Sequence, residues 1–327
     1  MNKQVARRCF DEKAFLENIK KRKRLALVII MVLLPLLFYV FLKLMKQKHY
    51  ILMSFLILLV VILPFFLVFE YRKPRARDVV LIASMTGFTV GANVVCSHTI
   101  PIHAGTALVV ISGISLGPEA GFLVGALGRL LCNVFDGQGP WTPWQMICWG
   151  LIGFLAGLAF NRTDIKAESL FEESTRRVRT SFQVIMGPVI AILVSELLGF
   201  TIFLVSQGGA KLSEYLGWWL YAFGALGLVT GCLFQRKKLT ADLLTMVIFT
   251  FFVTFIVYGG IMNFASLIMS SGMGFDADGV TAKALRTVYL AGAPYDLAHA
   301  GGASLCIFFG ESLIGKIQRV KIKYGIL

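Results

Sequence analysis

The chain has 327 residues, of which 57% are apolar and only 15% charged, and its net charge is +14. A soluble globular chain is nearer half apolar and a quarter charged, so the composition excludes an ordinary soluble domain and indicates a membrane protein. The basic residues form short patches between apolar runs and no aromatic-interleaved face, which argues against nucleic-acid binding. None of the six cysteines forms a CxxC pair, so no metal or redox cofactor is expected.

Apolar runs long enough, or nearly long enough, to cross a bilayer recur along the whole chain. They predict an all-α fold, a polytopic membrane helical bundle of about ten transmembrane helices. Two of the runs are short and meet at Gly117-Pro118, where proline suits the first position of a new helix. In chain order the predicted spans are 25–45, 51–69, 79–95, 104–117, 119–135, 143–160, 183–206, 215–234, 241–269 and 295–314.

The distribution of Lys and Arg between the loops sets the orientation, because cytoplasmic loops carry an excess of both. With the N-terminus inside, 25 of the 32 Lys and Arg residues lie in inner stretches and 6 lie in outer ones. This ratio supports ten spans with both termini cytoplasmic. The localisation expected is the plasma membrane of a bacterium.

A pattern of aromatic residues and glycines at 144–162 recurs 74 residues later at 218–236. In each copy an aromatic residue precedes a glycine, two more glycines follow at fixed spacing, and Phe-x-Arg ends the pattern. Both copies run from outside to inside. A duplication and convergent small-residue packing both explain the similarity.

Small residues recur at every fourth position in the span 79–95, namely Ala83, Gly87 and Gly91. Such stripes let membrane helices approach closely. The stripe predicts either packing inside the bundle or docking to a separate membrane subunit. Gly121 and Gly125 form a similar stripe.

The predicted outer loop 136–145 combines turn-forming Gly and Pro with two Trp and with hydrogen-bonding side chains such as Asp136 and Gln138. A single interfacial Trp is often only an anchor in the aromatic belt. Here the Trp residues stand among hydrogen-bonding groups on a constrained backbone, so we predict a ligand lid. Its candidate ligand-binding residues are Asp136, Gln138, Trp141, Trp144 and Gln145.

The stretch 293–302 opens the last predicted span and places Asp296 and His299 on one helix face. Asp296 is then expected near a helix start, where capping and ligand contact are both open readings. For His299 we favour ligand contact or a hydrogen bond to another helix.

Ionisable groups at membrane depth are costly and usually face the bundle interior. Glu119, Arg129 and Glu196 are such groups, with Asn133 as a polar companion. We expect Arg129 to pair with a carboxylate. These residues also allow a different class of function, a self-contained secondary transporter or channel.

No catalytic constellation is visible. The sequence contains no HExxH or GxSxG motif, and its one GxxxxGK pattern, at 310–316, ends in Ile317 where a nucleotide-binding loop needs Ser or Thr. The chain is therefore not expected to be an enzyme, and any use of ATP requires a partner. A polytopic membrane enzyme is the weaker alternative.

Five stretches together resemble the substrate-binding S component of an energy-coupling factor (ECF) transporter, closest to the members assigned to cobalamin uptake. The resemblance covers about 77–160 and 241–327. The run GPWTPWQM is fairly specific, whereas the Gly and Ala matches are weak alone. The stretches are GPEAGFLVGA at 117–126, GPWTPWQM at 139–146, WGLIGFLAG at 149–157, YGGIMN at 258–263 and PYDLAH at 294–299.

The resemblance implies a six-helix bundle that binds a vitamin from outside. A shared transmembrane coupling subunit and two cytoplasmic ATPases would then drive release inward. Ala83, Gly87 and Gly91 would contact the shared subunit, although Gly replaces the usual Ala at two positions. The expected partners are thus these subunits, a vitamin ligand and membrane lipid, with no nucleic acid.

Two departures from the family pattern define the domain organisation. Residues 1–76 form a basic tail with two extra helices, and the core 77–327 is interrupted by an apparent two-helix insertion at about 163–236. We expect the ligand site near the outer face, in loops 96–103, 135–145 and 270–296, with cobalamin as a possible ligand. The site residues expected beyond the lid are Asn263, Tyr295, Asp296 and His299, with His98 and His103 as secondary candidates.

Overall fold

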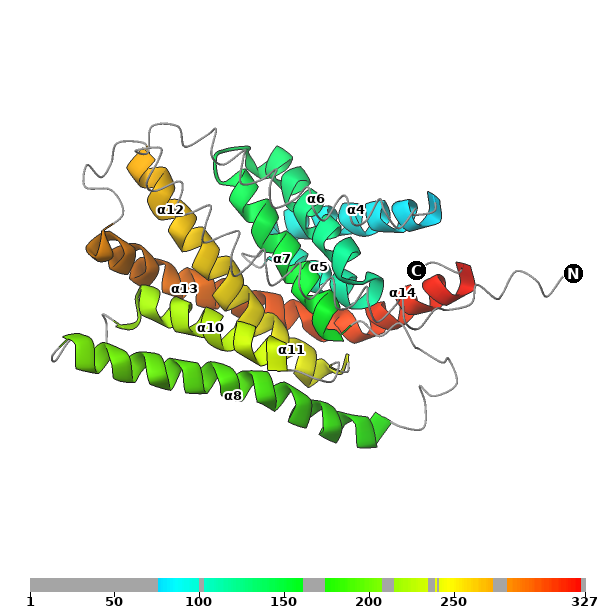
Figure 1. Cartoon of the computed structure of the whole chain (residues 1–327). Helices are drawn as coiled ribbons and strands as arrows, with labels where there is room; N and C mark the ends of the chain where they lie inside the picture. Colours follow the sequence, from blue (N-terminus) through cyan, green and yellow to red (C-terminus); the bar gives the residue numbers. More distant parts are fainter. Residues whose placement is uncertain are drawn as a thin grey trace, which may run out of the picture. The chain divides into compact units, whose positions relative to one another are not determined.

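The computed structural model describes residues 76–99, 103–160, 174–207, 215–234, 239, 241–272 and 281–324. The described part of the chain is helical, which confirms the predicted all-α polytopic bundle (Figure 1). The predicted spans 25–45 and 51–69, and the basic tail before them, lie outside the described residues. The following description concerns the compact unit that begins at Tyr50.

The first four described helices are α4 (Ala76–Thr99), α5 (Ala104–Leu116), α6 (Pro118–Asp136) and α7 (Thr142–Phe160). The predicted break between two short helices at Gly117-Pro118 is confirmed. Gly117 has φ +102°, a value that L side chains rarely adopt, and Pro118 occupies the start of α6. The amide of Gly117 donates to the carbonyl of Gly113 at 3.0 Å and so ends α5.

Glycines let α6 and α7 pack backbone against backbone. A Cβ on Gly121 would lie 2.5 Å from the carbonyl oxygen of Gly153, and a Cβ on Gly125 would overlap the carbonyl of Trp149. In a lipid bilayer the hydrophobic effect does not drive helices together, and close backbone packing of this kind supplies the attraction instead. The stripe of Gly121 and Gly125 is therefore an internal packing surface, and the two helices lie side by side in Figure 1.

A second antiparallel pair follows, formed by α8 (Ser174–Gln207) and α10 (Trp218–Phe234). In Figure 1 these helices lie together along one side of α13. Proline stands inside α8 at position 188. A small apolar pocket of about 30 Å³ lies near this proline, between α8, α10 and the next helix, and is lined by residues such as Ile185, Leu228 and Phe249.

The next span is a single rod with a π-helical turn in its middle. It consists of α11 (Leu243–Val253), the π-helix η4 (Thr254–Gly259) and α12 (Gly260–Gly272). Asp242 caps the start, since its carboxylate accepts from the amide of Thr245 at 3.1 Å. A π-turn widens the helix locally, and such turns occur frequently at functional sites.

The last span begins earlier than the sequence predicts. The helix α13 (Ala282–Cys306) starts at the cap Thr281 and is followed by η5 (Ile307–Phe309) and α14 (Gly310–Tyr324). The predicted span 295–314 therefore lies inside a longer helical segment, beginning within α13 and ending within α14. Hydropathy places the start of the span after the polar residues, whereas the helix includes those residues and continues across Pro294.

Four of the described helices are long and apolar enough to cross a membrane: Ala76–Ser97, Thr142–Phe160, Ile185–Ser206 and Leu243–Ser270. The apolar helices Ala104–Leu116 and Trp218–Gly231 are shorter. The core between these helices consists of large apolar side chains, with Trp144, Trp149 and Phe122 almost fully enclosed. Any polar group inside this core needs a partner, which makes the buried polar clusters below informative.

Candidate functional site

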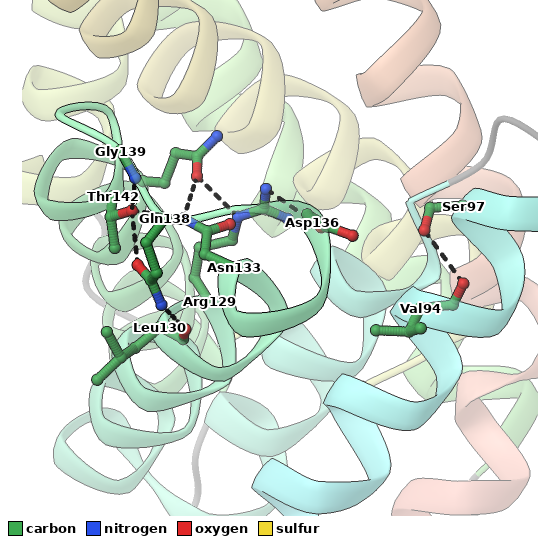
Figure 2. Close-up of polar contacts among 10 residues, drawn as sticks. Val94, Ser97, Arg129, Leu130, Asn133, Asp136, Gln138, Gly139 and Thr142 are labelled. Carbon is green, nitrogen blue, oxygen red and sulfur yellow. Dashed lines mark hydrogen bonds and ion pairs between the residues drawn. The ribbon is translucent and has the colours of Figure 1, made fainter.

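Arg129 organises a polar cluster where α6 and α7 approach their connecting loop, the predicted outer end (Figure 2). Its Nε donates to Oε1 of Gln145 at 3.0 Å, and its Nη2 lies 3.6 Å from a carboxylate oxygen of Asp136. The guanidinium carbon also lies 5.3 Å from the centre of the Trp149 ring. The expected pairing of Arg129 with a carboxylate is thus confirmed, and the cation is held in a fixed place.

Asn133 and the loop complete this cluster. Asn133 Nδ2 donates to Oγ1 of Thr142 at 2.9 Å and to Oε1 of Gln145 at 2.8 Å. Thr142 in turn donates to Oε1 of Gln138 at 2.9 Å, and the Gln138 amide donates to the carbonyl of Leu130 at 3.0 Å. Loop and helix ends are therefore tied together by side chains, as Figure 2 shows.

The two Trp residues of the loop region have different environments. Trp144 lies inside the core with 2% of its surface exposed, whereas Trp141 is 38% exposed at the loop tip. Gly137, with φ +100°, and Gly139, on which a Cβ would meet the Trp141 ring at 2.5 Å, leave room for this arrangement. Only Trp141 lies where a lid residue could move without disturbing the core.

A second polar cluster lies deeper and centres on Asp296 of α13. Oδ2 of Asp296 accepts from the Tyr221 hydroxyl at 2.5 Å and from Nδ2 of Asn263 at 2.7 Å. Asp296 is 8% exposed and Asn263 is 7% exposed. Side chains from α10, α12 and α13 thus meet at one buried carboxylate, and neither of its partners is a cation.

Close glycines shape the space around this carboxylate. A Cβ on Gly259 would lie 2.6 Å from the carboxyl carbon of Asp296. A Cβ on Gly292 would overlap the amide of Asn263. The hydroxyl of Tyr289 donates to the carbonyl of Gly260 at 2.7 Å, next to the π-turn. A side chain at position 259 would displace the Asp296 carboxylate, and one at position 292 would displace the Asn263 amide.

His299 lies between the two clusters, one helical turn from Asp296. Its Nε2 lies 2.9 Å from Oγ1 of Thr106 on α5. The ring packs edge-on against Tyr258 of the π-turn, with centroids 4.4 Å apart, and against His103, with centroids 4.8 Å apart. The expected hydrogen bond from His299 to another helix is therefore present.

The π-turn η4 lies against α13 at two consecutive residues. Tyr258 lies beside His299, and the adjacent Gly259 lies against Asp296. The widened turn presents two consecutive residues to two polar groups that a regular helix would place differently. The two polar clusters, together with His299 and η4, are the candidate site.

His103 lies at the predicted outer rim, just before α5 begins. Burial, reinforced by the Arg129 cation, holds the pKa of His103 below its usual 6.5, with Asp136 opposing. The ring is therefore neutral at pH 7.

The structure brings most of the predicted ligand-binding residues to this end of the bundle. Asp136, Gln138 and Gln145 belong to the Arg129 cluster, and Asn263 and Asp296 form the deeper one. Tyr295, in contrast, is 79% exposed. The expected place of Asp296 near a helix start is wrong, because α13 begins at Ala282 and Thr281 is its cap.

Three residues of the site were missed from the sequence: Tyr221, Tyr258 and Thr106. Tyr258 stands in the stretch YGGIMN, but nothing in its pattern predicts a π-turn. Of the secondary candidates, His103 lies beside His299, and the side chain of His98 is outside the described residues. Within the described ranges no group of three or more His, Cys, Asp or Glu could hold a metal ion.

The stripe on α4 differs from the internal stripe on α6. Ala83, Gly87 and Gly91 are exposed in the described unit, and no atom of it lies within 4 Å of a Cβ built on either glycine. Packing against the described helices therefore does not account for this stripe.

The other ionisable groups at membrane depth are held locally. Glu196 of α8 accepts from the hydroxyl of Tyr215 at 2.5 Å. Glu119 lies at the start of α6, where the positive end of the helix dipole favours a carboxylate. Arg129, Glu119 and Glu196 thus belong to separate local environments.

Comparison with known proteins gives one family. Residues 74–202 match the family model described as ECF-type riboflavin transporter, S component. The match covers less than half of the chain, from α4 into α8, and it agrees with the resemblance to ECF S components. It does not confirm the cobalamin subgroup. No solved structure matches the chain.

Proposed function

We propose that this chain is the substrate-binding membrane subunit of an ECF-type vitamin uptake transporter. One observation carries the proposal: polar side chains from α5, α6, α7, α10, α12 and α13 form hydrogen-bonded clusters inside an otherwise apolar bundle, and the π-turn lies against His299 and Asp296. Polar groups inside a membrane protein are expensive and are mostly retained for function. The family match over 74–202 supports the same class.

The chemistry of the site suits a small organic ligand with hydrogen-bonding edges. Donors and acceptors are paired at Arg129 and Gln145 in one cluster and at Asn263 and Asp296 in the other, among apolar and aromatic side chains. Binding sites for such ligands are mostly apolar with a few convergent polar groups. In this proposal the ligand takes over hydrogen bonds that these side chains make with one another.

Riboflavin is the first vitamin to test, because the matched family is named for it. Cobalamin, the ligand suggested by the sequence resemblance, is the alternative. Nε2 of His299 is engaged by Thr106, which leaves Nδ1 as the ring nitrogen that could bind the cobalt of a corrinoid.

Uptake in this proposal depends on a shared transmembrane subunit and two cytoplasmic ATPases. The exposed stripe of Ala83, Gly87 and Gly91 is the docking surface that we assign to the shared subunit. Small-residue surfaces suit close helix contact in a membrane. Arg129 is paired with Asp136 and Glu196 with Tyr215, and these separate local contacts favour this arrangement over a self-contained secondary transporter built on Arg129 and Glu196.

Transport in proteoliposomes tests the proposal. The chain is reconstituted with and without the coupling subunit and ATPases of its host, and uptake of radiolabelled riboflavin or cobalamin is followed with ATP inside or absent. We expect uptake only with the full set of subunits and ATP. Uptake by the chain alone, driven by a proton or sodium gradient, would establish the secondary-transporter alternative instead.

A further inference from the structure

The two antiparallel helix pairs of the described unit share a sequence pattern that extends beyond the short repeat at 144–162 and 218–236. The helix before the first copy begins GPEAGFLVG at 117–125, and the helix before the second contains GPVIAILVS at 187–195. The offset is 70 residues in these helices and 74 in the following ones, so the intervening connection is four residues longer in the second pair.

The same positions make the same packing contacts in both pairs. A Cβ on Gly157 of α7 would overlap the backbone of Pro118, and a Cβ on Gly231 of α10 would lie 2.7 Å from Cα of Pro188. Gly157 and Gly231 are 74 residues apart, and the two prolines are 70 apart. In each pair, the proline of the first helix thus packs against the last glycine of the second helix.

The contacts one and two turns further on also correspond. Gly153 packs against the carbonyl of Gly121, and Gly227 packs against the backbone of Ala191, with a built Cβ 2.9 Å from the Ala191 oxygen. These residues again have offsets of 74 and 70.

The third contact in each pair, at Gly125 and at Ser195, also corresponds. Gly125 lies against the carbonyl of Trp149, and at the equivalent place Oγ of Ser195 donates to the carbonyl of Phe223 at 2.8 Å. All three contacts share one register in the two pairs, which a duplication explains directly.

The copies differ at their outer ends. In the first pair Asn133 donates to Gln145 at 2.8 Å. The equivalent residues of the second pair are Phe203 and Trp219, whose ring centroids lie 5.6 Å apart. A hydrogen-bonded contact in the first copy is thus an aromatic contact in the second, and the second copy does not reproduce the Arg129 cluster.

At one position the second copy has a polar group where the first copy has an apolar side chain. Ile147 of α7 is a buried core residue, and its equivalent on α10 is Tyr221, whose hydroxyl donates to Asp296 at 2.5 Å. We propose that α8–α10 is a duplicate of α6–α7 whose function in the binding site is to position the Asp296 carboxylate through Tyr221. This inference rests on the proposed function, because Asp296 belongs to the proposed site.

The contacts of Tyr221 explain how it can position the carboxylate. Its ring stacks on Phe255 of the π-turn, with centroids 5.0 Å apart, and meets Tyr289 edge-on at 4.9 Å. The hydroxyl is therefore held by two rings on neighbouring helices and cannot follow Asp296 if the carboxylate moves. The same Oδ2 accepts from Asn263, so the two donors fix the carboxylate orientation.

The same hairpin contains a matched control. Tyr215 donates to the carboxylate of Glu196 at 2.5 Å, as Tyr221 does to Asp296, and its hydroxyl also lies 2.8 Å from the Glu196 carbonyl oxygen. Glu196 lies on α8 and belongs to no part of the proposed site. Tyr215→Phe and Tyr221→Phe therefore each remove a hydroxyl–carboxylate bond, and only the second should affect the ligand.

The experiment measures the dissociation constants of riboflavin and cobalamin for the purified full chain and its variants, with melting temperatures on the same samples. For whichever vitamin the wild type binds, Tyr221→Phe should weaken binding about 10-fold, the size expected for a hydrogen bond to a charged group. Tyr215→Phe should leave affinity within about two-fold. In an Asp296→Asn background, Tyr221→Phe should add less than about two-fold.

The outcomes separate this inference from the proposed function. A Tyr221→Phe variant that binds as tightly as the wild type, or that loses the same factor in the Asp296→Asn background, overturns the positioning function alone. Equal losses in Tyr221→Phe and Tyr215→Phe overturn it as well, because they indicate a general structural effect. A wild-type chain that binds neither vitamin overturns the proposed ligands and this inference with them.

Discussion

Two alanine substitutions on α6 test whether backbone contact between α6 and α7 holds the bundle together. A Cβ at Gly121 would lie 2.5 Å from the Gly153 oxygen and 2.6 Å from Cα of Gly113, whereas ordinary contact begins at 3.4 Å. Both neighbours are backbone atoms, so α5 and α7 must move by about 0.9 Å to accept the methyl group. At Gly128 the nearest atom is a methyl carbon of Thr89, 3.5 Å away.

The expected free energies follow from these distances. Overpacking costs about 3 kcal/mol at the upper end of its usual range, and replacing Gly by Ala within a helix returns about 1 kcal/mol. Gly121→Ala should therefore destabilise the chain by about 2 kcal/mol. Gly128→Ala should be neutral or stabilise it by up to about 1 kcal/mol.

Unfolding of the detergent-solubilised chain in an SDS titration, followed by Trp fluorescence, measures both variants on one scale. The account predicts that the midpoint falls for Gly121→Ala and does not fall for Gly128→Ala. Equal midpoints for the two variants would refute the conclusion that an added methyl group is costly at Gly121, where its neighbours are backbone atoms, and harmless at Gly128, where the nearest atom is a side-chain methyl carbon.

Three further predictions concern the proposed sites. Gly87→Leu, on a surface open in the described unit, should leave vitamin binding unchanged and abolish ATP-driven uptake; retained uptake would count against docking there. Arg129→Gln removes the cation beside Asp136 and should weaken vitamin binding about 10-fold in equilibrium titrations; unchanged affinity would exclude Arg129 from the site. Because the pKa of His103 is lowered in the folded chain, its neutral form stabilises the fold, and that contribution is lost as pH falls below 6.5. Wild type should therefore lose more stability than His103→Gln between about pH 7.5 and pH 5, measured by thermal unfolding, and parallel losses would contradict the assignment.

Much of the architecture follows from local sequence. Gly117-Pro118 ends one helix and starts the next because glycine tolerates φ +102° and proline fits the first helical position. The stripe of Gly121 and Gly125 indicates close helix contact. Which helix it meets requires the structure, because spacing on one helix does not identify the partner.

The start of α13 shows where hydropathy fails. Residues 282–294 include Lys283, Arg286 and Pro294, which lower the mean hydropathy without preventing a helix. The helix nevertheless starts at Thr281, whose hydroxyl accepts from the amide of Ala284 at 3.1 Å. Because of this shift, Asp296 lies in the middle of a helix among buried partners.

The centre of the candidate site depends on contacts between distant segments. Tyr221 and Asp296 are 75 residues apart and meet only because α10 packs beside α13. The π-turn that places Tyr258 beside His299 has no sequence signal comparable to a proline or a cap. A comparison of the repeated pairs, with Ile147 in one and Tyr221 in the other, is the one pattern that could have indicated the missing hydroxyl.

Equilibrium titration of the purified chain, without partner subunits, tests the central claim most directly. Riboflavin, cobalamin and a panel of other vitamins are added in turn, and the fluorescence of the five Trp residues is followed. The account predicts saturable, tight binding of one vitamin, weakened by Asp296→Asn. No saturable response to any vitamin in the panel would contradict the assignment of this chain as a vitamin-binding subunit.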